Sequence, residues 1–124
     1  MSTTLNKFDR GSEWGKWDLH AHTPLDHEWK NRPTFKNDAE REKFAKEYIK
    51  FAKERELTAI AITDHNFCNK LDECLIPFIQ KEAKKNSITI FPGFEITAKD
   101  GSGIHILCIF KEDADLNVIK QIVE

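Results

Sequence analysis

Cysteine is scarce in this 124-residue chain, and long apolar runs are lacking. The three cysteines, Cys68, Cys74 and Cys108, are odd in number and have no spacing typical of metal ligands, so we expect reduced thiols. No stretch approaches the roughly 20 apolar residues of a membrane-spanning helix, and the N-terminal segment has no apolar signal-peptide core. These absences predict a cytoplasmic protein with reduced cysteines and no membrane partner.

An excess of charge of either sign is also lacking. The formal net charge is −2 with 32% charged residues, so the total charge gives no argument for a nucleic-acid-binding surface. A nuclease is not excluded, because bound metal ions would supply positive charge locally. The length and the 40% of hydrophobic residues are those of one globular domain with a core.

Apolar periodicity divides the chain into alternating strands and helices. We expect a polar arm over residues 1–16 and one domain over residues 17–124. The first predicted elements are a strand at 17–22, a loop at 23–37, a capped helix at 38–56 and a buried strand at 57–63. Then come a helix from 71 that is kinked or restarts at Pro77, and a strand at 87–93. A hairpin at 94–110 turning at 100–101 and a helix begun near Asp113 or Asp115 follow. The order β-α-β-α-β-β-α predicts an α/β fold with a mostly parallel sheet.

Side chains that can bind a metal ion follow the predicted strands. His20 and His22 end the first strand, where residues two apart face the same side. Others lie in the first loop, after the second and third strands and in the return strand: Asp26, His27, Asp64, His65, Glu95 and His105. Ligands collect at the carboxyl ends of parallel strands, and imidazole and carboxylate groups suit Zn²⁺, Mn²⁺ or Fe²⁺. No histidine lies on a predicted helix, so we favour metal coordination over the alternative of unrelated surface histidines.

Four short motifs, in this order and spacing, resemble the PHP family, the polymerase and histidinol phosphatase domains. They are "DLHAHT" at 18–23, "ITDHN" at 62–66, "GFEI" at 93–96 and "GIHIL" at 103–107. The resemblance implies a distorted (β/α)7 barrel, of which this chain is the first half. It also implies up to three divalent metal ions (Zn, Mn or Fe) at the strand ends and hydrolysis of phosphoesters.

The resemblance implies a ligand for each metal position. His20 and His22 would bind the first metal, and Glu95 would bridge the first and the second. His105 would bind the second metal and His65 the third.

Two further positions take their roles from the same resemblance. The family often has an aspartate five residues after the second histidine, and here that position is His27, which can also bind a metal. Asp64 would orient a ligand or take part in proton transfer, with a solvated loop aspartate as the alternative. Asp64 and His65 are therefore the candidate catalytic residues. Cys68, close to His65, is an alternative metal ligand that a merely buried thiol would also explain.

The chain departs from the family at its C-terminal end. The family continues with another histidine and a late Asp-x-His, and a complete barrel has about 250 residues. We therefore expect about half a barrel, either a fragment or a site completed by another chain or copy. Unpaired sheet edges recruit other strands, so we expect this piece to self-associate, most simply as a two-fold dimer.

Two hypotheses for the function follow. The first is a metal-dependent phosphoesterase that uses metal-activated water on a small phosphomonoester or on RNA or DNA, with the isolated chain weak or inactive. The alternative is a non-catalytic scaffold or regulatory module of a larger polymerase- or ATPase-type protein. Residues 11–24, "GSEWGKWDLHAHTP", resemble PHP domains that head large AAA- or SMC-like bacterial ATPases, which implies a larger parent with an ATPase domain.

Overall fold

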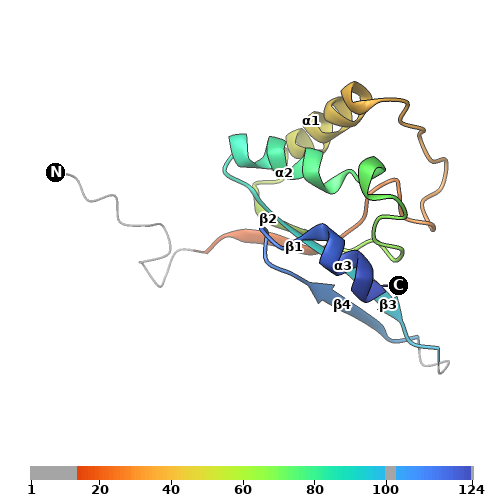
Figure 1. The fold of residues 1–124 in the computed structure, drawn as a ribbon. Helices are drawn as coiled ribbons and strands as arrows, with labels where there is room; N and C mark the ends of the chain where they lie inside the picture. Colours follow the sequence, from red (N-terminus) through yellow and green to blue (C-terminus); the bar gives the residue numbers. More distant parts are fainter. Residues whose placement is uncertain (1–13, 100–102, 124) are drawn as a thin grey trace.

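A computed structural model describes residues 14–99 and 103–123 and confirms the expected order of elements (Figure 1). The elements are β1 (Lys16–Ala21), α1 (Asp38–Glu54), β2 (Leu57–Ile62), the 3-10 helix η2 (Leu71–Glu73), α2 (Ile76–Lys85), β3 (Thr89–Thr97), β4 (His105–Ile109) and α3 (Leu116–Val123). The sheet has the order β1-β2-β3-β4, with the first three strands parallel and β4 antiparallel to β3. The expected arm, apart from residues 14–16, and the expected turn at 100–101 lie outside the described residues.

The three helices contribute to one apolar cluster with the strands. In α1, Ala45 and Ile49 recur at helical spacing and are buried, as is Ile79 of α2. They pack in the same core as Ile60 and Ile62, which lie two apart in β2 and so share one face of the sheet. Each fully buried isoleucine contributes about 2 kcal/mol from the area removed from water. This packing fixes which strand residues face the helices.

The helix starts follow their local sequence signals. The Asn37 side chain caps α1 by accepting the N–H of Glu40 at 3.0 Å, and the Glu40 carboxylate accepts the N–H of Lys36 at 2.6 Å. Of the two alternatives at Pro77, a kink or a restart, the structure shows a restart. The single-turn η2 ends at Glu73, and α2 begins at Ile76 with the proline in its first turn, where its missing N–H costs no hydrogen bond.

The expected end of the third strand at residues 92–93 is wrong. β3 runs unbroken through Pro92 and Gly93, pairing with β2 up to Pro92 and with β4 from Gly93 onward. Pro92 has no N–H to donate, but its carbonyl accepts the N–H of Phe110 at 2.9 Å. A Cβ on Gly93 would collide with the backbone carbonyl of Cys108, so glycine allows β4 to approach. These two residues mark a change of partner strand.

The expectation of reduced thiols is wrong for two of the three cysteines. Cys68 and Cys74 form a disulfide across the loop that contains η2, whereas Cys108 is a free thiol. The loop folds back so that the two Cα atoms lie 5.4 Å apart, a separation at which a disulfide fits. Cys68 therefore has no thiolate to offer a metal ion, which removes the alternative ligand near His65.

Within residues 14–99 and 103–123, no helix combines the length and the apolar character needed to cross a membrane.

Candidate metal centre

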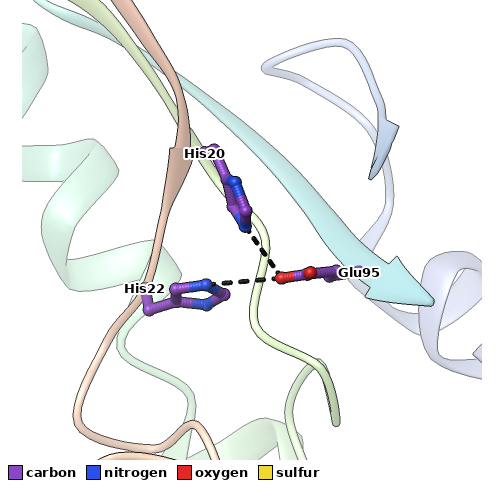
Figure 2. A group of neighbouring side chains, drawn as sticks. All are labelled: His20, His22 and Glu95. Carbon is purple, nitrogen blue, oxygen red and sulfur yellow. Dashed lines mark hydrogen bonds and ion pairs between the residues drawn. The ribbon is translucent and has the colours of Figure 1, made fainter. Parts of the chain in front are cut away.

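Glu95 of β3 lies at the centre of a cluster of imidazole rings. Its side chain is buried, and its Oε2 atom lies 2.8 Å from Nε2 of His20, 3.3 Å from Nε2 of His65 and 3.4 Å from Nε2 of His22. The other oxygen, Oε1, contacts Nδ1 of His105. Figure 2 shows His20 and His22 converging on Glu95 from one side. Five residues that the sequence singled out are thus brought together.

Strand pairing explains why residues so far apart in sequence meet here. β1, β2 and β3 are parallel neighbours, so their carboxyl ends lie at the same edge of the sheet. The N–H of Thr63 donates to the carbonyl of Ala21 at 2.8 Å, which continues the β1–β2 pairing up to His22. The N–H of Glu95 donates to the carbonyl of Asp64 at 3.3 Å and so holds Glu95 against the end of β2.

Asp64 is buried, which excludes the alternative of a solvated loop aspartate. Its Oδ1 accepts the N–H of Thr23 at 2.7 Å, and its Oδ2 accepts the Thr23 hydroxyl at 2.5 Å. Oδ1 also lies 3.4 Å from Nδ1 of His22. Burial raises the pKa of Asp64 to about 6, although the hydrogen bonds from Thr23 oppose this rise. Asp64 therefore fixes the first residue of the loop that follows His22.

Asp26 is a buried carboxylate that the sequence placed among the possible metal-binding side chains but to which the family resemblance gave no role. Its Oδ2 accepts the backbone N–H of His65 at 2.8 Å and contacts Nδ1 of the same residue at 3.0 Å, while Nδ1 of His22 lies 3.1 Å away. Burial alone would raise the pKa of Asp26, but hydrogen bonds from His65 and Glu28 outweigh burial and lower it to about 2. The only sequence signal was its place in the loop, four residues after His22.

His27 approaches the cluster through His65. The two rings meet edge-on with centroids 5.1 Å apart, and His27 is more than half exposed. Glu28 lies beside both, with its carboxylate oxygens 4.0 Å from Nε2 of His27 and 3.8 Å from Nε2 of His65. This pair forms the solvent-facing rim of the cluster, and Glu28 is a second acidic residue that sequence reasoning did not include.

Comparison with known families identifies the domain type. The family model of the PHP domain matches residues 40–123. The chain belongs to the PHP domain family. The match includes His65, Glu95 and His105 but begins after His20 and His22, which join the site through the geometry around Glu95. No curated protein matches the chain.

Membership explains the architecture and the kind of site. The curled four-stranded sheet with its helices is compatible with part of a PHP-type barrel. PHP domains typically bind divalent metal ions, and the family generally has metal-dependent phosphoesterase activity. The resemblance seen in the sequence motifs is therefore confirmed at the level of the family.

The described residues fit a divalent cation. Groups of three imidazole and carboxylate side chains have donor atoms that all lie within 4.8 Å of one another: His20–His22–Glu95, His22–Asp26–His65, His27–Glu28–His65 and His65–Glu95–His105. With Zn–N and Zn–O bonds of about 2.0–2.1 Å, the ligand atoms of a tetrahedral zinc ion lie about 3.4 Å apart. The separations of 2.8–3.4 Å around Glu95 Oε2 are close to that value.

Two ring nitrogens of this PHP domain support the same conclusion. Among the described residues, Nδ1 of His22 and Nε2 of His65 are buried and have no hydrogen-bond partner. In addition, three Nε2 atoms face one oxygen of Glu95, which has only two lone pairs to accept protons. Buried polar atoms without partners are unfavourable, and a metal ion beside Glu95 would satisfy Nε2 of His65, whereas Nδ1 of His22 lies 3.1 Å from Oδ2 of Asp26.

The charges inside the cluster are adjusted to one another. Burial would lower the pKa of His65, but its contact with Asp26 raises that pKa above the usual range. Burial would raise the pKa of Glu95, but hydrogen bonds from His20 and His105 lower it. The carboxylates of Asp26 and Glu95, whose pKa values are both lowered, are therefore ionised at neutral pH, as metal binding requires.

Proposed function

We propose that this chain is part of a PHP-type (β/α)7 barrel that hydrolyses a phosphoester with the help of divalent metal ions, Zn²⁺, Mn²⁺ or Fe²⁺. The observation that carries the proposal is the convergence of four histidines on buried Glu95, with Nε2 of His65 buried there and without a hydrogen bond among the described residues. Divalent ions in such a site lower the pKa of water and neutralise the oxygens of a phosphate group.

The residues divide among the metal positions as the family resemblance implies. His20, His22 and Glu95 would hold the first ion, and Glu95 with His105 would hold the second. A third position would use His65, with His27 beside it.

Asp64 would act indirectly, by positioning the metal ligand His22 through hydrogen bonds with Thr23. It binds both the N–H and the hydroxyl of Thr23, so it fixes the loop directly after His22 and with it the direction of that ring. His65 lies between Glu28 of the rim and Glu95, and it would act in catalysis through the metal ion that it binds.

The site is open on one side, which favours a substrate that approaches from solvent. The side chains of His20, His27 and His105 are each about half exposed. The histidines of the cluster face the carboxylates of Asp26 and Glu95, which offset any positive charge on the rings. Positive charge to bind a phosphate group would therefore come from bound metal ions. A small phosphomonoester and the end of an RNA or DNA strand both satisfy these conditions.

Hydrolysis assays with added metal test the proposal. Because we expect the isolated chain to be weakly active or inactive, its full-length parent would be incubated with Mn²⁺, Zn²⁺ or Fe²⁺ and with p-nitrophenyl phosphate, labelled RNA or labelled DNA. We expect metal-dependent turnover that the double substitution His20→Ala, His22→Ala removes, and that Asp113→Asn, an exposed carboxylate away from the site, leaves unchanged. Metal binding without turnover of any substrate would instead support the non-catalytic scaffold. The larger parent with an ATPase domain stays a prediction from residues 11–24.

A further inference from the structure

The Asp26 carboxylate contacts both the loop that contains it and two rings of the histidine cluster. It lies in the loop after β1 and is 2% exposed. Its Oδ1 accepts the N–H of Glu28 at 2.8 Å, which fixes the turn of the loop. Its Oδ2 accepts the backbone N–H of His65 at 2.8 Å and lies 3.0 Å from Nδ1 of the His65 ring. One carboxylate thus holds both the backbone and the ring of His65.

This contact determines which ring nitrogen of His65 carries the proton. An ionised carboxylate can only accept hydrogen bonds, so Nδ1 of His65 must donate to Asp26. In the neutral ring, the lone pair then lies on Nε2. That atom is buried, has no hydrogen bond among the described residues, and lies 3.3 Å from Oε2 of Glu95. A histidine that binds a metal usually donates its other ring N–H to a carboxylate in this way.

The same oxygen of Asp26 also lies beside the ring of His22. Nδ1 of His22 is 3.1 Å from Oδ2, and the rings of His22 and His65 are stacked at 5.3 Å with 6° between their planes. Both rings therefore place Nδ1 next to Asp26 and Nε2 toward Glu95, at 3.4 and 3.3 Å. Asp26 and Glu95 lie on opposite sides of this parallel pair.

We propose that Asp26 is a positioning residue of the metal centre: it holds the His65 proton on Nδ1 and aligns His22 and His65 so that their Nε2 atoms face the metal position beside Glu95. This inference adds a residue role to the proposed function. It rests on that function in one respect: the metal ion bound beside Glu95 is the ion used for hydrolysis. The family ligand pattern gives this position no role, since it places the ligand of this loop at residue 27.

The tautomer of His65 can be measured without metal and without substrate. The ¹⁵N-labelled chain, freed of metal by a chelator, would be examined at pH 8 by long-range ¹H–¹⁵N correlation, which distinguishes a protonated ring nitrogen from an unprotonated one. The variants are Asp26→Asn, which replaces a charged acceptor by a neutral one of the same shape, and Asp26→Ala, which removes the acceptor. Asp113→Asn is the matched control at an exposed position. Zn²⁺ affinity of the same samples would be measured by calorimetry.

We expect the unsubstituted chain and Asp113→Asn to show the His65 proton on Nδ1, and Asp26→Ala to show it mainly on Nε2. We also expect Asp26→Asn to weaken Zn²⁺ binding by roughly 10–100-fold, with Asp26→Ala weaker still. A proton on Nε2 of His65 in the unsubstituted chain would overturn the inference even if neither variant folds. Folded variants that bind Zn²⁺ within two-fold of the control would also overturn it. With these results intact, failure of the full-length parent to hydrolyse any of the phosphoester substrates would refute the proposed function alone.

Discussion

Replacing Asp64 by asparagine should stabilise the metal-free chain at neutral pH. Burial raises the pKa of Asp64 from 3.8 to about 6, so the folded state binds this proton more tightly than the unfolded state. Binding of this proton stabilises the folded state relative to the unfolded state. This stabilisation is fully present below pH 3.8 and is lost as pH rises through about 6. A pKa of about 6 in place of 3.8 means that about 3 kcal/mol of this stabilisation is lost by pH 7.5. Asparagine carries no charge and can still accept the N–H of Thr23.

Urea unfolding of the metal-free chain between pH 4 and pH 8 would measure this difference. We expect Asp64→Asn to gain up to about 3 kcal/mol over the unsubstituted chain at pH 7.5, and to lose that advantage near pH 4. Asp113→Asn, which alters an exposed carboxylate, should follow the unsubstituted chain throughout. Parallel pH curves for Asp64→Asn and the unsubstituted chain would refute the account of Asp64 as a buried, proton-binding carboxylate.

Other consequences concern packing, the disulfide and assembly. Gly93→Ala should cost roughly 1–3 kcal/mol in denaturant unfolding, because its Cβ would collide with the Cys108 carbonyl, and an unchanged midpoint would contradict the close approach of β3 and β4. Replacing Cys68 and Cys74 together by serine should cost about 2 kcal/mol under oxidising conditions and little in a reductant; equal losses in both would rule out the disulfide as the cause. We propose that the chain forms a two-fold dimer, because β1 and β4 are the edge strands of the sheet and Ile104 and Ile106 are exposed. Light scattering should detect this dimer, and a strict monomer at high concentration would contradict it.

Elements with strong local signals could be predicted from the sequence. The capping pair Asn37 and Glu40 located the start of α1, and Pro77 located the restart before α2. The continuous apolar run at 57–63 indicated a strand buried in a parallel sheet, which β2 confirms. In each case the determining interactions lie within a few residues, so tertiary contacts did not alter the outcome.

The errors arise where distant contacts decide the structure. Pro92 and Gly93 resemble a strand end locally, but pairing with β4 carries β3 through them. The Cys68–Cys74 bond depends on how the loop around η2 folds back. Asp26 could be named from the sequence as a possible metal-binding side chain, but its role could not be predicted, because it lies in contacts with His65, 39 residues away in the sequence.

The quantity of metal bound by the purified chain decides whether the cluster around Glu95 is a metal centre. The chain would be loaded with Zn²⁺ or Mn²⁺, dialysed, and analysed by mass spectrometry for metal content beside Glu95→Gln. We predict at least about one equivalent of metal in the unsubstituted chain and a marked loss in Glu95→Gln, because Glu95 contacts four histidines. Less than about a tenth of an equivalent in the unsubstituted chain would contradict the assignment of this cluster as a metal centre.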